Sequence, residues 1–355
     1  MFQPNAFFSP PRWFETTRAL MQNCIDAIHS WQITNISFQP AQYNAGPPEA
    51  KRALLHTQST QKPAHTVLTI LDDPSVQLES DVSTLKHELQ LMQAELTQSK
   101  KLLFQANAER QKFSSALALA RDLQDNLQPA GAPKVPGLDI CVRSKPAHEV
   151  TGDFYDFRFH GPNELVFTLG DISGKGMAAG LLMTMARKVL RTSLHVLAQP
   201  TPDAMLEYAN QDLYEEFTNT NTFATTFVGQ FASERRMLQY ANAGHSPVIF
   251  RSNAEGAQLL PADCAPIGVL PENQSIVRQI YLLPGDILVV GSDGITDARN
   301  EDGEMFGLGR LLQLVDAQVN QSASEIVDAI FKALAAFEAE GAQDDDQTLM
   351  VLKGV

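Results

Sequence analysis

Residues 85–127 contain neither proline nor glycine and repeat their apolar side chains in alternating steps of four and three. The two repeating positions hold Leu85, Met92, Ser99, Ala106, Phe113, Ala120 and Leu127, and Leu89, Leu96, Leu103, Arg110, Leu117 and Gln124. Six such heptads predict one helix of about 65 Å with a coiled-coil seam. The alternative is a single helix lying on its own domain, because Arg110 and Gln124 are poor seam residues.

This helix divides the chain into residues 1–75, a linker over residues 80–128 and a domain over residues 129–355. The first part is predicted to be a small α/β module, with helices at ETTRALMQNCIDAIHSW and PEAKRALLHTQ and strands at TNISFQ and HTVLTIL. Its histidines, His29, His56 and His65, are scattered, so they indicate surface or packing roles.

Gln128-Pro129 and the following GAPKVPG end the helix and begin the last domain. Its predicted strands are LDICVRS, DFYDFRF, ELVFTLG, FATTFVGQF, MLQYANA, PVIFRS, SIVRQIYL, DILVVGS and TLMVLK. Its predicted helices span residues 176–198, 202–219, 307–319 and 322–340. Antiparallel hairpins with helices inserted in pairs favour an α+β layered fold over a doubly wound parallel sheet.

The charge of the chain is concentrated in this domain. The net charge is −14 overall, and residues 129–355 carry −13 of it. Such a domain repels nucleic acid and acidic membrane surfaces, so neither is an expected partner. No apolar run approaches the roughly 18 residues that span a bilayer, and the N-terminus lacks the pattern of a signal peptide. We therefore expect a cytoplasmic protein.

The three cysteines, Cys24, Cys141 and Cys264, are far apart and form no CxxC pair. They indicate small buried or half-buried residues and neither a disulfide framework nor a structural zinc site.

Aspartates recur where predicted strands begin or end. Asp153 precedes a strand, Asp171 and Asp293 close strands before glycine-containing loops, and the run Asp344–Asp346 precedes the last strand. Carboxylates are rarely placed at core strand ends unless they are paired or bind a metal. Mg²⁺ and Mn²⁺ prefer oxygen ligands, so these aspartates predict a site for such ions.

Two glycine-containing segments resemble catalytic motifs without matching them. GDISGKG has only three residues before GK, and Gly176 follows the lysine, so it is not a nucleotide-binding loop. Gly174, Gly176 and Gly180 instead indicate a tight strand-to-helix turn and close helix packing. GHSPV is not GxSxG and is predicted to be a hairpin turn. Asp286 and Asp302 are interpreted as turn residues.

Taken in order, TGDFYDF, GDISGKGMAAGLLM, ANAGHSPVIF, PGDILVVGSDGITDARN and DDDQTLMVL closely resemble the metal-dependent serine/threonine protein phosphatases (PPM, the protein phosphatase 2C family). The likeness is greatest to the bacterial RsbU/SpoIIE branch and covers about residues 120–355. It includes ARDLQDNLQP, which resembles the helix that leads into the catalytic domain of that branch.

The resemblance implies two antiparallel sheets sandwiched between helices, with two Mn²⁺ or Mg²⁺ ions at one edge. By it, Asp171 bridges both ions, the Ile172 carbonyl replaces a glycine carbonyl, and Asp293 and Asp345 each bind one ion. Asp153 binds an ion or holds an ion-bound water, and Asp153, Asp171 and Asp293 form the catalytic set. Because Asp344, Asp345 and Asp346 are consecutive, the resemblance assigns the last ligand only to within one residue of Asp345.

The implied chemistry is attack by a metal-activated water on phosphoserine or phosphothreonine, without a protein nucleophile. Eukaryotic relatives have a phosphate-binding arginine where this chain has His148 and Glu149. Lys145 or Arg143 would replace it only if turned inward; the alternative for both is an exposed salt bridge.

The resemblance further implies a phosphatase acting on a phosphorylated STAS-domain antagonist of an anti-sigma factor, in partner-switching signalling. We also expect a homodimer joined through residues 85–127 and an upstream regulator that acts on residues 1–75. The alternative function is a catalytically inactive, phosphatase-like binding module. Acidic residues at every expected metal position argue against it, since a scaffold has no need to sustain their repulsion.

Overall fold

The computed structural model of the chain describes residues 74–338 and 343–355. The module predicted for residues 1–75 lies outside the described residues except for the first two residues of a helix. The expectations for Cys24 and for the three N-terminal histidines also lie outside them.

Ten strands of the described part form two five-stranded sheets, and all neighbouring strands are antiparallel. The first sheet has the order β1 (Leu138–Lys145), β10 (Gln347–Gly354), β9 (Ile287–Gly291), β6 (Val248–Ser252), β7 (Gly256–Leu259). The second has the order β2 (Phe154–Phe159), β3 (Glu164–Ile172), β4 (Ala224–Ala232), β5 (Met237–Ala243), β8 (Arg278–Tyr281). The chain therefore alternates between sheets.

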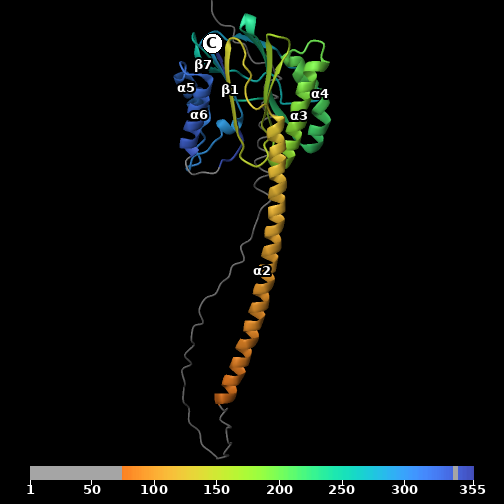
Figure 1. The fold of residues 1–355 in the computed structure, drawn as a ribbon, viewed down its shortest axis with the longest axis vertical. Helices are drawn as coiled ribbons and strands as arrows, with labels where there is room; N and C mark the ends of the chain where they lie inside the picture. The colour runs from red at the N-terminus through yellow and green to blue at the C-terminus, as the bar shows by residue number, and fades with distance from the viewer. Residues whose placement is uncertain (1–73, 339–342) are drawn as a thin grey trace, which may run out of the picture. The chain divides into compact units, whose positions relative to one another are not determined.

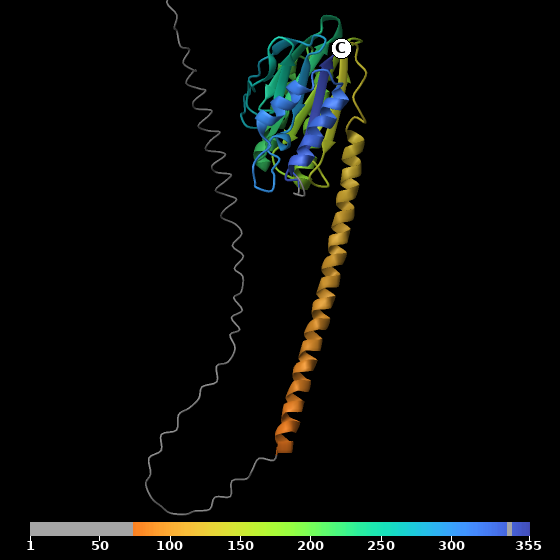
Figure 2. The ribbon, with the colours of Figure 1, turned by 90° about the vertical axis from the view of Figure 1, so that its left-hand side faces the viewer.

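Helix pairs cover the outer faces of both sheets (Figure 1). Helices α3 (Gly176–Val196) and α4 (Pro202–Thr220) pack on the second sheet. Helices α5 (Gly307–Ala317) and α6 (Ala323–Glu338) pack on the first sheet, and Figure 2 views the molecule from their side. This arrangement confirms the predicted α+β sandwich of antiparallel sheets flanked by helices.

Alternation of side chains along the strands produces three apolar layers. In β3, Leu165 and Phe167 point between the two sheets, whereas Val166 points toward α3 and α4. The inter-sheet layer contains a contact between the rings of Phe167 and Phe227, whose centroids are 6.0 Å apart. A period of two therefore places both faces of the same strand in apolar surroundings.

Two strand predictions need correction. The strand predicted at SIVRQIYL is restricted to β8, and β7 was not predicted. The GHSPV segment is not a hairpin turn, because β5 and β6 lie in different sheets and the segment crosses between them. His245 is buried there, and the Asn242 side chain accepts from its backbone N–H and donates to its carbonyl oxygen. Local turn chemistry does not reveal which sheet receives the next strand.

One buried ion-pair network joins β2 to α3. The Arg191 guanidinium donates to both oxygens of Asp156, at 2.7 and 2.9 Å, and the buried Arg187 side chain lies 3.4 Å from the same carboxylate. Removing one partner from such a network leaves a buried charge unpaired, which lowers the stability of the fold. The network therefore fixes α3 against the strand that follows Asp153.

Helix α2 (Pro74–Leu127) confirms the predicted long helix, and it ends just before Gln128-Pro129 as expected. The seam residues Leu85, Leu89, Leu96 and Leu103 are all exposed. Apolar side chains outside the seam are exposed as well: Leu91, Leu102, Phe104, Leu119 and Leu123.

Within the described residues, no helix combines the length and apolar character needed to cross a membrane.

Gln124 is a poor residue for a coiled-coil seam, and it is buried against the domain that follows the helix, with 6% of its surface exposed. The last turn of α2 therefore follows the alternative of a helix that lies on its own domain. The heptad pattern describes only the helix itself, so it does not show which part of the domain the last turn contacts.

Candidate metal centre

The aspartates singled out in the sequence meet at one end of the two sheets. Asp153 directly precedes β2, and Asp171 lies near the end of β3; these ends are adjacent because Phe154 pairs with Gly170. Asp293 follows β9, and Asp345 precedes β10, whose residue Leu349 pairs with Gly291. Each sheet therefore contributes aspartates from neighbouring strands.

Ser292 links the two sheets at this end. Its hydroxyl donates to Oδ2 of Asp153 at 2.8 Å and accepts from the Thr348 backbone N–H at 2.9 Å. Gly294 allows the loop that contains Asp293 to lie very close to the Asp346 backbone, since a Cβ there would be 2.1 Å from the Asp346 carbonyl oxygen. No pattern in the sequence indicates this role of Ser292, because it depends on contacts between distant segments.

Asp153 is a buried carboxylate with incomplete hydrogen bonding. Only 1% of its surface is exposed, and its Oδ1 has no hydrogen-bond partner. Burial, followed by the charge of Asp171, raises its pKa well above the ordinary value. A buried oxygen of this kind needs a proton or a cation.

Asp171 and Asp293 repel each other and Asp345. Burial raises the pKa of Asp171 well above its ordinary value, and the carboxylates of Asp293 and Asp345 add to the effect. Desolvation and then the carboxylates of Asp345 and Asp297 raise the pKa of Asp293 to about 6. Because the Asp293 residue is exposed, water and salt screen part of this repulsion.

The three consecutive aspartates lie in different environments. Asp344 is exposed. Asp345 forms a 2.9 Å ion pair with Lys175 and acts on the pKa values of Asp171 and Asp293. The carboxylate of Asp346 accepts hydrogen bonds from the loop before β2. Asp346 also raises the pKa values of Asp153 and Asp171, so both Asp345 and Asp346 lie near the cluster, and Asp345 is the one whose carboxylate is not bound to that loop.

The carboxylate of Asp346 fixes the loop that presents Asp153. It accepts hydrogen bonds from the Ala147 N–H at 2.8 Å, the Thr151 hydroxyl at 2.7 Å and the Gly152 N–H at 3.0 Å. A Cβ at Gly152 would lie only 3.0 Å from the Ile172 carbonyl oxygen and 3.2 Å from Oδ1 of Asp171. The Ile172 carbonyl thus lies beside the Asp171 carboxylate, next to this loop.

The donor set suits a hard divalent cation that keeps part of its water shell. Within the described ranges, no group of three or more carboxyl, imidazole or thiol side chains is placed so that it could hold a metal ion. Mg²⁺ is commonly held by one or two carboxylates and several waters, so a set of three such side chains is not required. Carboxylates with raised pKa values and the unpaired Oδ1 of Asp153 fit such an ion.

The last turn of α2 contacts the loop that presents Asp153. The Gln124 amide donates to the carbonyl oxygens of Thr151 and Gly180, at 3.2 and 3.1 Å, and accepts from the Thr151 N–H at 3.1 Å. Gly180 confirms its predicted packing role, because a Cβ there would lie 2.7 Å from the Gln124 amide nitrogen. Gln124 therefore joins α2 to both the loop and α3.

The residues considered for phosphate binding are placed elsewhere. His148 and Glu149 are exposed. Arg143 pairs with Asp328 and lies over the Phe331 ring, while Lys145 is 3.7 Å from Glu338. Arg143 and Lys145 therefore follow the predicted salt-bridging alternative and are directed to α6.

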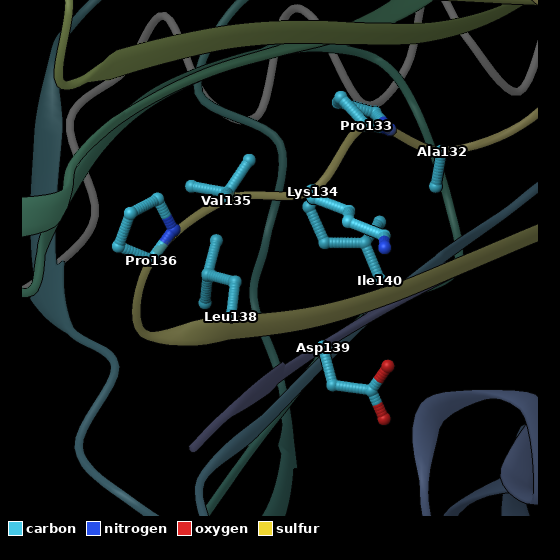
Figure 3. Close-up of a pocket in the computed structure, with 8 residues that line it drawn as sticks. All are labelled: Ala132, Pro133, Lys134, Val135, Pro136, Leu138, Asp139 and Ile140. Carbon is cyan, nitrogen blue, oxygen red and sulfur yellow. The ribbon is translucent and has the colours of Figure 1, made fainter.

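A cavity of about 440 Å³ lies along residues 132–140 (Figure 3). It lies at the opposite end of β1 from the aspartates: Leu138 pairs with Gly354, whereas Lys145 pairs with Gln347, next to Asp346. Its lining is mainly apolar, with Lys134 and Asp139 as the charged members. The cavity is separate from the candidate metal centre.

Comparisons with known proteins agree with this architecture. Residues 161–354 match the family model described as Stage II sporulation protein E (SpoIIE). The chain is 29% identical over 261 residues to Protein IcfG of Synechocystis sp. (strain ATCC 27184 / PCC 6803 / Kazusa), covering 66% of this chain and 41% of IcfG. It is 27% identical over 248 residues to Phosphoserine phosphatase RsbU of Bacillus subtilis (strain 168), covering 68% of this chain and 71% of RsbU.

Solved structures show the same fold. The SiaA-PP2C domain of Pseudomonas aeruginosa superposes with a TM-score of 0.62 at 22% identity, covering 70% of this chain and 99% of that domain. The PP2C phosphatase domain of SpoIIE from Bacillus subtilis, with a fragment of its regulatory domain, gives a TM-score of 0.53 at 18% identity, covering 62% and 64%.

We expect Gln124→Ala to destabilise the domain by about 1–3 kcal/mol, because it removes the hydrogen bonds of the Gln124 amide to the buried backbone N–H and carbonyl of Thr151. Urea unfolding measures the change, and Gln105→Ala, at an exposed glutamine of α2, is the matched control. Equal stability of the two variants would show that the Gln124 contacts contribute nothing.

We expect Asp293→Asn to stabilise the metal-free protein above pH 6. The Asp293 carboxyl keeps its proton to a higher pH in the folded chain than in the unfolded chain, so the folded chain loses stability between about pH 4 and about pH 6. Below about pH 4 the carboxyl is protonated in both states, and this loss is absent. Urea unfolding in EDTA between about pH 4 and pH 8 measures the difference from the unmodified chain. The turn variant Asp302→Asn is the control, and parallel pH profiles for Asp293→Asn and the unmodified chain would contradict the expectation.

Proposed function

Since the chain belongs to the SpoIIE family, in the RsbU/SpoIIE branch of the PP2C-type serine/threonine phosphatases, we propose that it is a metal-dependent phosphoserine/phosphothreonine protein phosphatase. The observation that carries the proposal is the meeting of Asp153, Asp171, Asp293 and Asp345 at one end of the sandwich, with raised pKa values for the first three. These residues repel one another unless cations lie between them.

Asp171 is close to the aspartates of both sheets. Its charge raises the pKa of Asp153, which belongs to the same sheet, and the charges of Asp293 and Asp345, from the other sheet, raise the pKa of Asp171. We assign it to bridge two ions, with Asp293, Asp345 and the Ile172 carbonyl completing the protein ligands. Asp153, oriented by Ser292, holds an ion or its water. Two Mn²⁺ or Mg²⁺ ions would supply a water of lowered pKa and neutralise the phosphoryl oxygens.

Two serine hydroxyls of the described residues lie near the aspartates, and both are engaged in other hydrogen bonds. The Ser292 hydroxyl is buried and donates to Asp153. The Ser173 hydroxyl accepts from the Phe223 N–H at 2.9 Å. Neither serine is hydrogen-bonded to an imidazole of the kind that activates a nucleophilic serine, and we propose hydrolysis without a phosphoenzyme.

We propose a phosphorylated STAS-domain protein as the substrate, in partner-switching signalling in the cytoplasm. The relative RsbU, a phosphoserine phosphatase by name, supports a phosphoserine substrate, and the STAS domain is proposed from the resemblance to the RsbU/SpoIIE branch. The acidic surface of the domain disfavours nucleic-acid partners. Residues 1–75 remain the proposed place of action for an upstream regulator.

We also propose that α2 joins two copies of the chain. Its exposed seam residues Leu85, Leu89, Leu96 and Leu103 follow a heptad spacing, and an isolated helix in water does not keep so many leucines exposed. Through Gln124, a change in the dimer would reach the Asp153 loop. Such a contact supports a regulatory role for the linker.

We expect Asp171→Asn to lower kcat/KM for a phosphoserine peptide by about 10³-fold or more, because metal ligation contributes several kcal/mol to the transition state. The measurement is Mn²⁺-dependent phosphate release, with Asp302→Asn as the control. Trapping during turnover should yield no phosphoenzyme. Turnover that is independent of Asp171, or a kinetically competent phosphoserine on the enzyme, would contradict the proposal; a stably folded chain without turnover favours the inactive binding module.

We expect the full chain to be a dimer and the double variant Leu96→Glu/Leu103→Glu to be a monomer, because paired seam glutamates repel and cannot be buried. Light scattering measures the mass. The control is Leu91→Glu/Leu102→Glu, which changes exposed leucines outside the seam and should leave the dimer intact. A monomeric unmodified chain would contradict the coiled coil.

A further inference from the structure

One cationic side chain lies directly against the aspartate cluster. The Lys175 ammonium is 2.9 Å from Oδ2 of Asp345 and donates to the Asp344 carbonyl oxygen. It also acts on Asp293, whose pKa it lowers against the larger effects that raise it. Among the ion pairs of the described residues, this is the one that joins a lysine or arginine to Asp153, Asp171, Asp293 or Asp345.

The backbone presents Lys175 at a position suited to an anion. It lies between two glycines with positive φ, Gly174 at 102° and Gly176 at 73°, and immediately precedes α3. Its own backbone is extended, and its side chain is 48% exposed. The adjacent N-terminus of α3 adds to the local preference for negative charge.

The pairing of Lys175 with Asp345 is easily exchanged. Both side chains are nearly half exposed, at 48% and 43%, and ion pairs of this kind contribute little stability. A divalent cation bound to Asp345 would remove the attraction that holds the ammonium there. The freed ammonium would then lie beside the place where a substrate brings a doubly charged phosphoryl group.

We propose that Lys175 binds the phosphoryl group of the substrate. It would replace the phosphate-binding arginine of the eukaryotic relatives, at whose position this chain has His148 and Glu149. This inference rests on the proposed phosphatase function. Arg143 and Lys145 are engaged with Asp328 and Glu338 on α6, whereas Lys175 faces the carboxylates. An ammonium is a compact point charge that suits a phosphoryl group approached from one side.

The test is equilibrium dialysis of radiolabelled inorganic phosphate against the Mn²⁺-loaded full chain. We expect Lys175→Met to weaken phosphate binding about tenfold, as the loss of one charged hydrogen bond implies. Lys175→Arg should stay within about threefold of the unmodified chain, because it keeps the charge. Lys188→Met, at an exposed lysine of α3 without an ion pair among those described, is the matched control and should bind normally.

Calorimetric titration of Mn²⁺ into the same variants distinguishes phosphate binding from a static counter-ion role. A change in Mn²⁺ affinity of Lys175→Met without a change in phosphate affinity overturns the proposal, and so does an unmodified Mn²⁺-loaded chain that binds no phosphate. Hydrolysis of a phosphoserine peptide is measured separately. If the unmodified chain fails to hydrolyse it while Lys175→Met still loses phosphate affinity, the phosphatase function fails and the anion site stands.

Discussion

Repulsion among carboxylates at one end of the sandwich is the constraint on which the rest of the site depends. Asp153, Asp171 and Asp293 all have raised pKa values, and each is raised further by a neighbouring aspartate. A folded protein keeps such a cluster only if other contacts hold it in place. Here the holding contacts are the Ser292 hydroxyl and the hydrogen bonds of Asp346 to the loop before β2.

The same contacts connect the site to the long helix. Asp346 and Gln124 bind the Thr151–Gly152 segment from two sides, one from the turn before β10 and the other from α2. Movement of the last turn of α2 would therefore displace backbone that lies two residues from Asp153. This gives the linker a physical route to the proposed metal ligands that needs no rearrangement of either sheet.

Much of the fold follows from patterns that are local in the sequence. The heptads predicted α2, the strand pattern predicted an α+β layered fold with antiparallel hairpins, and glycines 174, 176 and 180 predicted the tight start of α3. The division into two antiparallel sheets was implied by the family resemblance. The aspartates at strand ends were recognisable because charge is unusual there. By contrast, the burial of Gln124, the hydroxyl bridge of Ser292 and the crossing at His245 depend on segments far apart in the chain, and no local pattern encodes them.

The central claim is that two divalent ions join the aspartates of the two sheets. Anomalous scattering from crystals grown with Mn²⁺ tests it most directly. The account predicts two peaks within ligand distance of Asp171, one of them also contacted by Asp293 or Asp345, and their loss in Asp171→Asn crystals. Crystals of the folded protein in saturating Mn²⁺ with no peak at Asp171, or with peaks only elsewhere on the acidic surface, would contradict it.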